Sequence, residues 1–468
     1  MSHRDNDCRT PSLTNAQALS AAIQGLWGNT TWKVALRTDC GWSVSGLVMA
    51  ALVWACSASE TLTGRFGQAL KFASGLGRRL APATTSYQAF MKLLVRWTAD
   101  LRNDLVRQYR RIMEEAFPEP FRFAGFVVLG GDGSKLQLAR TRSNEAGYSA
   151  KTRTTKGRKR RTKRRKLSRQ ARARRACDKK ADAPQMALTV LHHLTLRLPW
   201  DWRLGSYDSS EREQLLDMVP HLPSDALVVA DCGFYGYEFW SALLASGRHF
   251  LVRVGGNVRL LKKLGVVRER CGTVYLWPDQ IAQRNREPLV LRLIEVHDGR
   301  RSWYLVTSVL DSRRLSDRQV AQIYGYRWRI ELFFRHFKQT YGRVKLRSHK
   351  GTHAACEAEW SLLGLWTMLL HARLQLPPEN RNRVSVARVL RAFAQAIDYG
   401  SWRPEPGESL SERLAQALVD PYPRRDRTSR DYPRKKYEKS PGAPRIRAAT
   451  WTQRQRAQKV MQTAAQKG

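Results

Sequence analysis

The segment 151–180 limits what this chain can fold into more than any other stretch. It contains 17 Lys or Arg residues and a single acid, Asp178. Like charges at this density repel one another and offer little apolar surface to bury, so residues 141–182 are predicted to form an insertion that is disordered on its own. A folded core must therefore be assembled from segments on both sides of it.

The same basic segment is predicted to bind phosphate backbones. Dense positive charge gives an affinity that depends on salt and not on base sequence. The segment has no aromatic residue that could stack on bases. A solubilising or localisation tract is the alternative interpretation.

The chain as a whole is strongly basic. Its 468 residues include 82 Lys or Arg and 40 Asp or Glu, which gives a formal net charge of +42. A field of this sign concentrates nucleic acids, the commonest polyanions in a cell. The length and the hydrophobic fraction of 42% are sufficient for a sizeable core. The composition therefore predicts a nucleic-acid-binding protein with several domains.

Short patterns exclude several other classes of protein. The seven cysteines contain no C-x-x-C pair, which argues against a zinc ribbon or a redox centre. Asp5 and Asp7 stand where a signal peptide needs an apolar core, and the most apolar stretch, Gly46–Cys56, is too short to span a bilayer. No phosphate-binding loop of the form G-x-x-x-x-G-K-[ST] is present, so no nucleotide cofactor is expected. We predict a cytoplasmic, nucleoid-associated protein without a membrane segment.

The periodicity of apolar residues predicts an α/β protein with a mixed-sheet core and helical regions at both ends. Five parts are expected: a helical N-terminal region that is a candidate for binding DNA ends (1–120), the first part of the core (121–247), a β-rich insertion (248–312), the second part of the core with a long helix and C-terminal helices (313–400), and a basic tail (401–468). From residue 420 the tail is expected to be extended or loosely packed.

Individual elements follow from the same patterns. Helices are predicted at Thr14–Leu26, Val44–Ser57, Thr63–Leu76, Tyr87–Phe117, Ser316–Lys338, 355–376 and 384–398. Strands are predicted at Phe126–Leu129, Lys135–Ala139, Gln185–Leu196, Ala226–Ala230, His249–Val254, Thr273–Leu276, Leu289–Val296 and Trp303–Val309. The sequence Gly130–Gly133 is interpreted as a tight turn between the first two of these strands.

Three acids stand at positions that suit a two-metal nuclease core. Asp132 follows an apolar strand, Asp231 follows the strand at 226–230, and Glu331 lies within the long helix. Hard divalent cations prefer oxygen ligands, and several carboxylates are needed to offset their charge. A single Asp after a strand is usually a turn residue, so the prediction depends on all three acids together.

The long helix carries a polar strip along one side. At about 100° per residue, Tyr324, Arg327, Glu331 and Lys338 fall at roughly 0°, 300°, 340° and 320°, a strip about 60° wide. Much of the remaining circumference is apolar, and Trp328 belongs to that part. A polar line on a mostly buried helix favours a functional role over an ordinary charged surface, which is the alternative.

These residues resemble a known signature. Tyr324-x2-Arg327-x3-Glu331-x6-Lys338 is similar to the Y-R-E-K signature of DDE transposases from bacterial insertion sequences. Asp132-Gly-Ser resembles the first D-G-[ST] element of that family, and Asp231-Cys-Gly-Phe-Tyr resembles its second element. The three acids are separated by 99 and 100 residues. The resemblance covers about residues 125–345, and the long basic segment is a departure from it.

The resemblance implies an RNase H-like core in which Asp132, Asp231 and Glu331 bind two Mg²⁺ or Mn²⁺ ions. It also implies DNA contacts near the cut, for which Tyr324, Arg327, Lys338 and the neighbouring Trp328 are the predicted residues. The expected partners are double-stranded DNA, as element ends and as target, and a second copy of the chain in a homodimer on paired ends. Family members free a 3′-hydroxyl that attacks a target phosphodiester, and some place an extruded base on a tryptophan of the insertion.

Two residues in the matching region, Trp277 and Trp303, are candidates for that tryptophan, although packing is the commoner role for either. Two other functions stay open. An RNase H-like nuclease would hydrolyse DNA without strand transfer, and an inactive transposase derivative would bind DNA without cleaving it.

Overall fold

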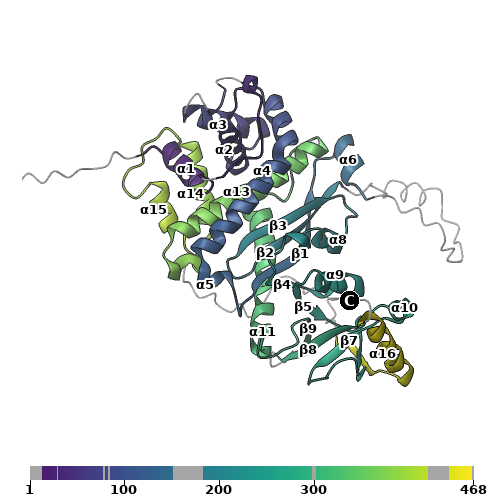
Figure 1. Cartoon of the computed structure of the whole chain (residues 1–468). Helices are drawn as coiled ribbons and strands as arrows, with labels where there is room; N and C mark the ends of the chain where they lie inside the picture. Colours follow the sequence, from purple (N-terminus) through teal and green to yellow (C-terminus); the bar gives the residue numbers. More distant parts are fainter. Residues whose placement is uncertain are drawn as a thin grey trace, which may run out of the picture.

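The computed structural model describes residues 13–28, 30–76, 80–82, 85–150, 183–297, 302–419 and 442–465 (Figure 1). The basic segment 151–180 lies outside these described residues, and so do the predictions made for it. Among the described helices, none combines the length and the apolar character that crossing a membrane requires.

The N-terminal region is helical, as predicted. Its helices are α1 (Asn15–Gln24), α2 (Val44–Cys56), α3 (Leu62–Gly75), α4 (Tyr87–Ala116) and the short α5 (Pro118–Phe121). A Ser or Thr caps each of the first four by accepting a hydrogen bond from a backbone N–H of the first turn. α2 and α4 pack on α13 (Gly351–Gln375), a largely buried C-terminal helix. The N-terminal helices and α13 therefore form one helical layer.

The described strands form one ten-stranded sheet in the order β10-β6-β7-β8-β9-β5-β4-β1-β2-β3. Their bounds are β1 Val127–Gln137, β2 Gln185–His193, β3 Leu198–Gly205, β4 Ala226–Ala230, β5 His249–Val254, β6 Arg259–Lys262, β7 Thr273–Leu276, β8 Leu289–His297, β9 Ser302–Thr307 and β10 Arg445–Ala448. β1, β2 and β3 are antiparallel, whereas β1, β4 and β5 are parallel. This arrangement confirms the RNase H-like mixed sheet that the resemblance implies.

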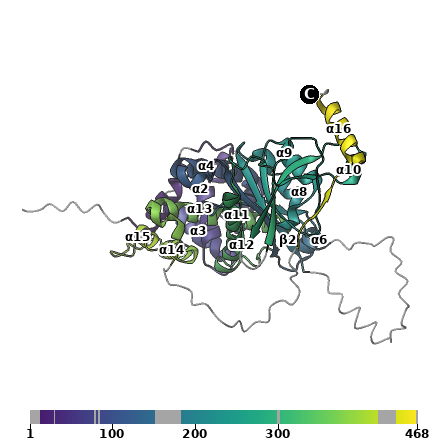
Figure 2. The ribbon, with the colours of Figure 1, turned by 90° about the horizontal axis from the view of Figure 1, so that it is seen from below.

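Helices cover both faces of this sheet (Figure 2). α4, α13 and α12 (Trp328–Arg335) lie on one side, whereas α8 (Glu211–Leu216) and α9 (Tyr237–Ala245) lie on the other. The remaining described helices are α6 Arg142–Tyr148, α10 Asp279–Gln283, α11 Asp317–Tyr326, α14 Val386–Asp398, α15 Leu410–Ala415 and α16 Trp451–Ala465, with short 3₁₀ helices η1 Thr38–Cys40, η2 Val219–His221, η3 Cys232–Phe234 and η5 Pro378–Arg383.

The predicted turn at Gly130–Gly133 is wrong, because β1 runs without interruption through these residues. Its glycines serve close packing. A Cβ on Gly131 would lie 2.4 Å from the Leu215 side chain, and a Cβ on Gly133 would lie 2.2 Å from the carboxyl of Glu211. Both contacts are with α8, which can approach the strand only where side chains are missing. Asp132 therefore lies inside a strand.

β3 was missed in the sequence, and the strand predicted at Gln185–Leu196 ends earlier, at His193. β3 contains Pro199 and the charged Asp201, which obscure a strand pattern. Asp201 is nevertheless only 3% exposed. It accepts hydrogen bonds from Arg102 and Arg110 of α4, so the charge is compensated from the adjacent helix.

The described part of the tail, residues 442–465, contains a strand and a helix that were not predicted. β10 pairs in parallel with β6, with Ile446 opposite Leu260, and α16 follows directly. Ala457 and Val460 of α16 are buried. The C-terminal segment therefore completes the edge of the β-rich half of the sheet.

The helix predicted from Ser316 to Lys338 is divided. α11 ends at Tyr326, α12 begins at Trp328, and a π-helical segment, η4 (His336–Thr340), follows. At the junction, the N–H of Arg327 donates to the carbonyl of Tyr324, an i to i−3 bond that tightens the turn. Because the π-helical turn also changes the rotation per residue, the uniform 100° spacing does not hold as far as Lys338.

Candidate active site

Asp132 and Asp231 lie side by side at the edge where β4 ends. The last residue pair of the parallel β1–β4 ladder joins Gly130 to Val229. Asp132 and Asp231 each come two residues later, so they continue the same register. Asp231 also caps η3, because its Oδ1 accepts a hydrogen bond of 2.8 Å from the N–H of Gly233.

The pleat of β1 determines which face Asp132 occupies. Gly131 and Gly133 face α8. Successive residues of a strand point to opposite faces, so Asp132 points to the face on which α12 packs. Its Oδ1 accepts a hydrogen bond of 2.8 Å from the N–H of Gly133, which orients the carboxylate.

The charge of Asp132 is poorly compensated by the protein. Partial burial raises the pKa of Asp132 to about 6, and the nearby charges of Asp231 and Glu211 act in the same direction. The backbone N–H of Gly133 and the charge of Arg327 oppose this shift. A carboxylate with a raised pKa beside other acids is typical of a site that awaits a cation or a proton.

Glu331 is held at this site by Arg327. The Arg327 guanidinium donates to Glu331 Oε1 at 2.6 Å within the first turn of α12. The charges of Tyr324, Glu331 and Asp231 outweigh the effect of burial and raise the pKa of Arg327 above its usual range. Arg327 thus interacts with acids from both parts of the core. Among the described residues, no three His, Cys, Asp or Glu side chains are grouped closely enough to hold a metal ion.

Glu211 was not identified in the sequence, although it lies at this site. It is the first residue of α8, and its carboxyl approaches Gly133 from the face opposite to Asp132. Burial and the charge of Asp231 raise the pKa of Glu211, whereas Lys135 lowers it. No sequence pattern could have identified this role, because the approach depends on how α8 packs on the glycines of β1.

The four predicted DNA contacts differ in exposure. Trp328 is 57% exposed, and Lys338 is half-buried with its ammonium donating to Ser134 Oγ, two residues from Asp132. Tyr324 is only 6% exposed and packs against Trp303, with ring centroids 5.4 Å apart. The guanidinium of Arg327 lies 5.7 Å from the centre of the Tyr324 ring.

The two tryptophans of the insertion both serve packing. Trp277 is buried, and its Nε1 donates to the carbonyl of Arg286. Trp303 is half-buried and packs against Tyr324 of α11, the helix that precedes Arg327 and Glu331 in the chain. Of the two, Trp303 is therefore the one joined to the candidate site.

Comparison with known proteins finds a similarity in the region of this site. Residues 150–366, slightly less than half of the chain, match the family model of the transposase DDE domain. Asp231 and Glu331 lie inside the matched segment of that domain, and Asp132 precedes it.

Two individual proteins are also similar to this chain. The transposase InsG for insertion sequence element IS4 of Escherichia coli K12 is 25% identical over 202 residues, which are 41% of this chain and 45% of that protein. The match thus spans less than half of the relative. The cryo-EM structure of the piggyBac transposase synaptic complex with hairpin DNA aligns over 88% of this chain and 84% of that chain, with 10% identity and a TM-score of 0.36.

Proposed function

We propose that the chain is a DNA transposase that cleaves the ends of an insertion sequence and joins them to target DNA. Asp132, Asp231 and Glu331 are its catalytic acids in this proposal. The observation that carries it is the shared register of Asp132 and Asp231 at the end of two parallel strands, facing the helix of Glu331. The match of the surrounding segment to the transposase DDE domain supports the same function.

The three carboxylates are not grouped closely enough to hold a metal ion in this structure, but their chemistry suits two Mg²⁺ or Mn²⁺ ions. Carboxylate oxygens are the ligands that hard divalent cations prefer, and the raised pKa of Asp132 reflects negative charge that the protein leaves largely uncompensated. Asp132, Asp231 and Glu331 would hold the ions, and Glu331 would exchange its contact with Arg327 for a metal ligand bond. When bound, the ions supply activation of the attacking oxygen and stabilisation of the leaving oxygen.

The cations and aromatic residues around these acids would bind the DNA. Lys338 lies close to Asp132 through Ser134, and it would neutralise a phosphate next to the cut. Trp328 is exposed at the start of α12, the helix that carries Glu331, and would contact the DNA directly. Released from Glu331, Arg327 would bind a phosphate. The ring of the buried Tyr324 would pack against the Arg327 guanidinium. A direct contact between Tyr324 and DNA stays a prediction.

The partners in this proposal are double-stranded DNA at the element ends, a target DNA, and a second copy of the chain in a homodimer on paired ends. Such a protein would be associated with the nucleoid. Its large positive charge supports binding to DNA of any sequence, which would add to recognition of the ends.

The test uses duplexes taken from the inverted repeats that flank the coding region, incubated with the full-length protein and Mg²⁺. We expect release of a 3′-hydroxyl at the repeat boundary and joined products with a second duplex. Glu331→Gln should bind the same DNA without producing either. Cleavage without joining would favour the hydrolytic nuclease instead, and binding without cleavage by the unaltered protein would favour an inactive derivative.

A further inference from the structure

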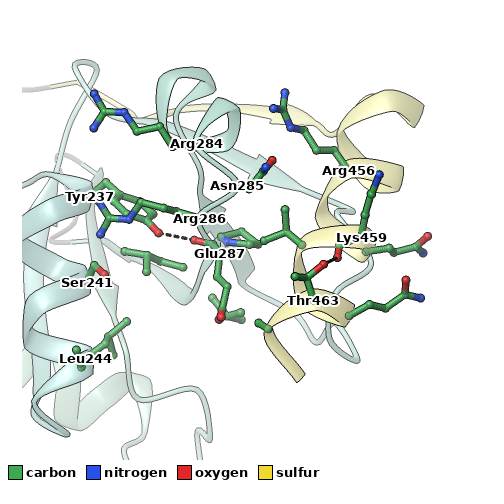
Figure 3. Close-up of a pocket in the computed structure, with 18 of the residues that line it drawn as sticks. Tyr237, Ser241, Leu244, Arg284, Asn285, Arg286, Glu287, Arg456, Lys459 and Thr463 are labelled. Atoms are coloured by element: carbon green, nitrogen blue, oxygen red, sulfur yellow. Dashed lines mark hydrogen bonds between the residues drawn. The ribbon is translucent and has the colours of Figure 1, made fainter. Parts of the chain in front are cut away.

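A groove with a volume of about 1760 Å³ lies between α9, the segment 284–290 and α16 (Figure 3). Its walls come from segments that are far apart in the sequence. It exists only because β10 pairs with β6 and returns the C-terminal segment to the sheet. The catalytic proposal uses none of the residues that line it.

The groove is rich in cations without acidic partners. Arg284 and Arg456 project from opposite walls, and Lys459 follows one turn after Arg456 on α16 (Figure 3). None of the three takes part in an ion pair within the described part of the chain. By contrast, Arg286 is held by Glu238 at 2.6 Å. α16 contains three cations and no acid, so this wall carries only positive charge.

The lining also supplies uncharged hydrogen-bonding groups, among them Asn285, Gln455, Gln458, Gln462, Thr452 and Thr463. It includes apolar side chains and one acid, Glu287, so its cations outnumber its acids. Amide and hydroxyl side chains next to Arg and Lys are the usual contacts of phosphate and sugar. The one aromatic residue in the lining is Tyr237, and its hydroxyl already donates to the carbonyl of Glu287 at 2.6 Å. Interfaces between proteins are richer in aromatic anchors, so the lining favours a nucleic acid over a protein partner.

The groove begins close to the candidate active site. α9 starts six residues after Asp231, and Tyr237, Ser241 and Leu244 line the groove from one face of that helix. A helix of nine residues is about 13 Å long. The groove therefore extends along α9, a helix that begins shortly after Asp231 in the chain.

We propose that this groove binds the phosphate backbone of double-stranded DNA that continues beyond the catalytic acids. The proposal rests on the proposed function for the origin of that DNA, but its contacts are separate from the cleavage chemistry. Arg456 and Lys459 hold one strand through its phosphates, and Arg284 approaches from the opposite wall. The groove thus lengthens the binding site without reading base sequence.

The test compares two duplexes that contain the same repeat end. One ends about two base pairs past the cleavage point, and the other ends about 20 base pairs past it, roughly two helical turns. The variant Arg456→Gln/Lys459→Gln should bind the longer duplex roughly tenfold more weakly, and its salt dependence should be less steep by about two because two phosphate contacts are lost. Binding and cleavage of the shorter duplex should not change.

Two control variants separate this effect from charge and folding. Arg391→Gln/Arg403→Gln removes the same charge from exposed positions on α14 and shortly after it, away from the groove, and should bind like the unaltered protein. Arg456→Lys/Lys459→Arg should retain full affinity. An unchanged affinity of the glutamine variant for the longer duplex, or an equal loss for both duplexes, would overturn the proposal. Failure of the unaltered protein to cleave the shorter duplex would instead count against the proposed function.

Discussion

Two aspartates in the same sheet show how this protein separates structural from functional charge. Asp201 in β3 contacts three arginines, Arg102, Arg110 and Arg203, and their charges outweigh its burial and lower its pKa. Asp132 in β1 has acids as neighbours, and its pKa is raised to about 6. The fold thus neutralises one carboxylate completely and leaves the other to an external cation.

The difference follows from where the neighbouring helices carry their charges. α4 presents Arg102 and Arg110 to β3 at a spacing of two helical turns, and both reach Asp201. At β1, by contrast, the cation whose charge acts on Asp132 is Arg327, and Arg327 forms its ion pair with Glu331. A buried acid is therefore no guide to function by itself, and the signs of the charges around it distinguish the two cases.

The largest expected effect is on catalysis. Asp231→Asn should reduce Mg²⁺-dependent DNA cleavage by about 10³-fold or more, because a neutral amide is a weak ligand for a hard dication. Asp225→Asn, just before the other end of β4, is the matched control and should cleave normally. The measurement is single-turnover cleavage of a labelled repeat end. Comparable rates for the two variants would remove Asp231 from the catalytic set.

The structural aspartate should show the opposite behaviour. Asp201→Asn removes the acid that Arg110 and Arg203 contact and leaves Arg102 with Glu359 alone, so the free energy of unfolding should fall by about 3 kcal/mol in urea denaturation. Cleavage per folded molecule should be nearly unchanged. If the variant were as stable as the original protein but inactive, the distinction between the two aspartates would be wrong.

A smaller effect is expected from the pH dependence of stability. The pKa of Asp132 is about 6 in the folded protein and 3.8 in the unfolded chain, so both forms are protonated at low pH and stability is lost as the pH rises through this window. In metal-free buffer, Asp132→Asn should therefore be more stable than the original protein at pH 8, by up to about 2 kcal/mol after allowance for solvent screening.

Near pH 4 the two proteins should unfold at similar urea concentrations, because the carboxyl is then neutral when folded. Addition of Mg²⁺ at pH 8 should stabilise the original protein and leave Asp132→Asn unaffected. A stability difference that is independent of pH would show that packing, and not the carboxylate charge, causes it.

The contrast also explains what could be predicted from the sequence. Asp132, Asp231 and Glu331 could be chosen because each stands at a short motif, and the strand before Asp231 could be found because it is uniformly apolar. The position of Asp132 within a strand could not be predicted, because glycines that permit close packing look the same as glycines that form a turn. β3 escaped notice because the charge of Asp201 is neutralised by a helix about a hundred residues earlier.

The same limit applies to Glu211, the acid that the sequence did not reveal. Its carboxyl reaches the site from α8, across the strand from Asp132, so its charge adds to the potential there without lying on the same face. Glu211→Gln should therefore raise the Mg²⁺ concentration required for half-maximal cleavage by roughly threefold, with little change in the rate at saturating Mg²⁺. Glu213→Gln, on the same helix turn, is the control and should resemble the original protein. A loss of rate that excess Mg²⁺ cannot restore would mean that Glu211 contacts the reacting groups directly. Glu211 would then be a fourth catalytic carboxylate, in addition to Asp132, Asp231 and Glu331.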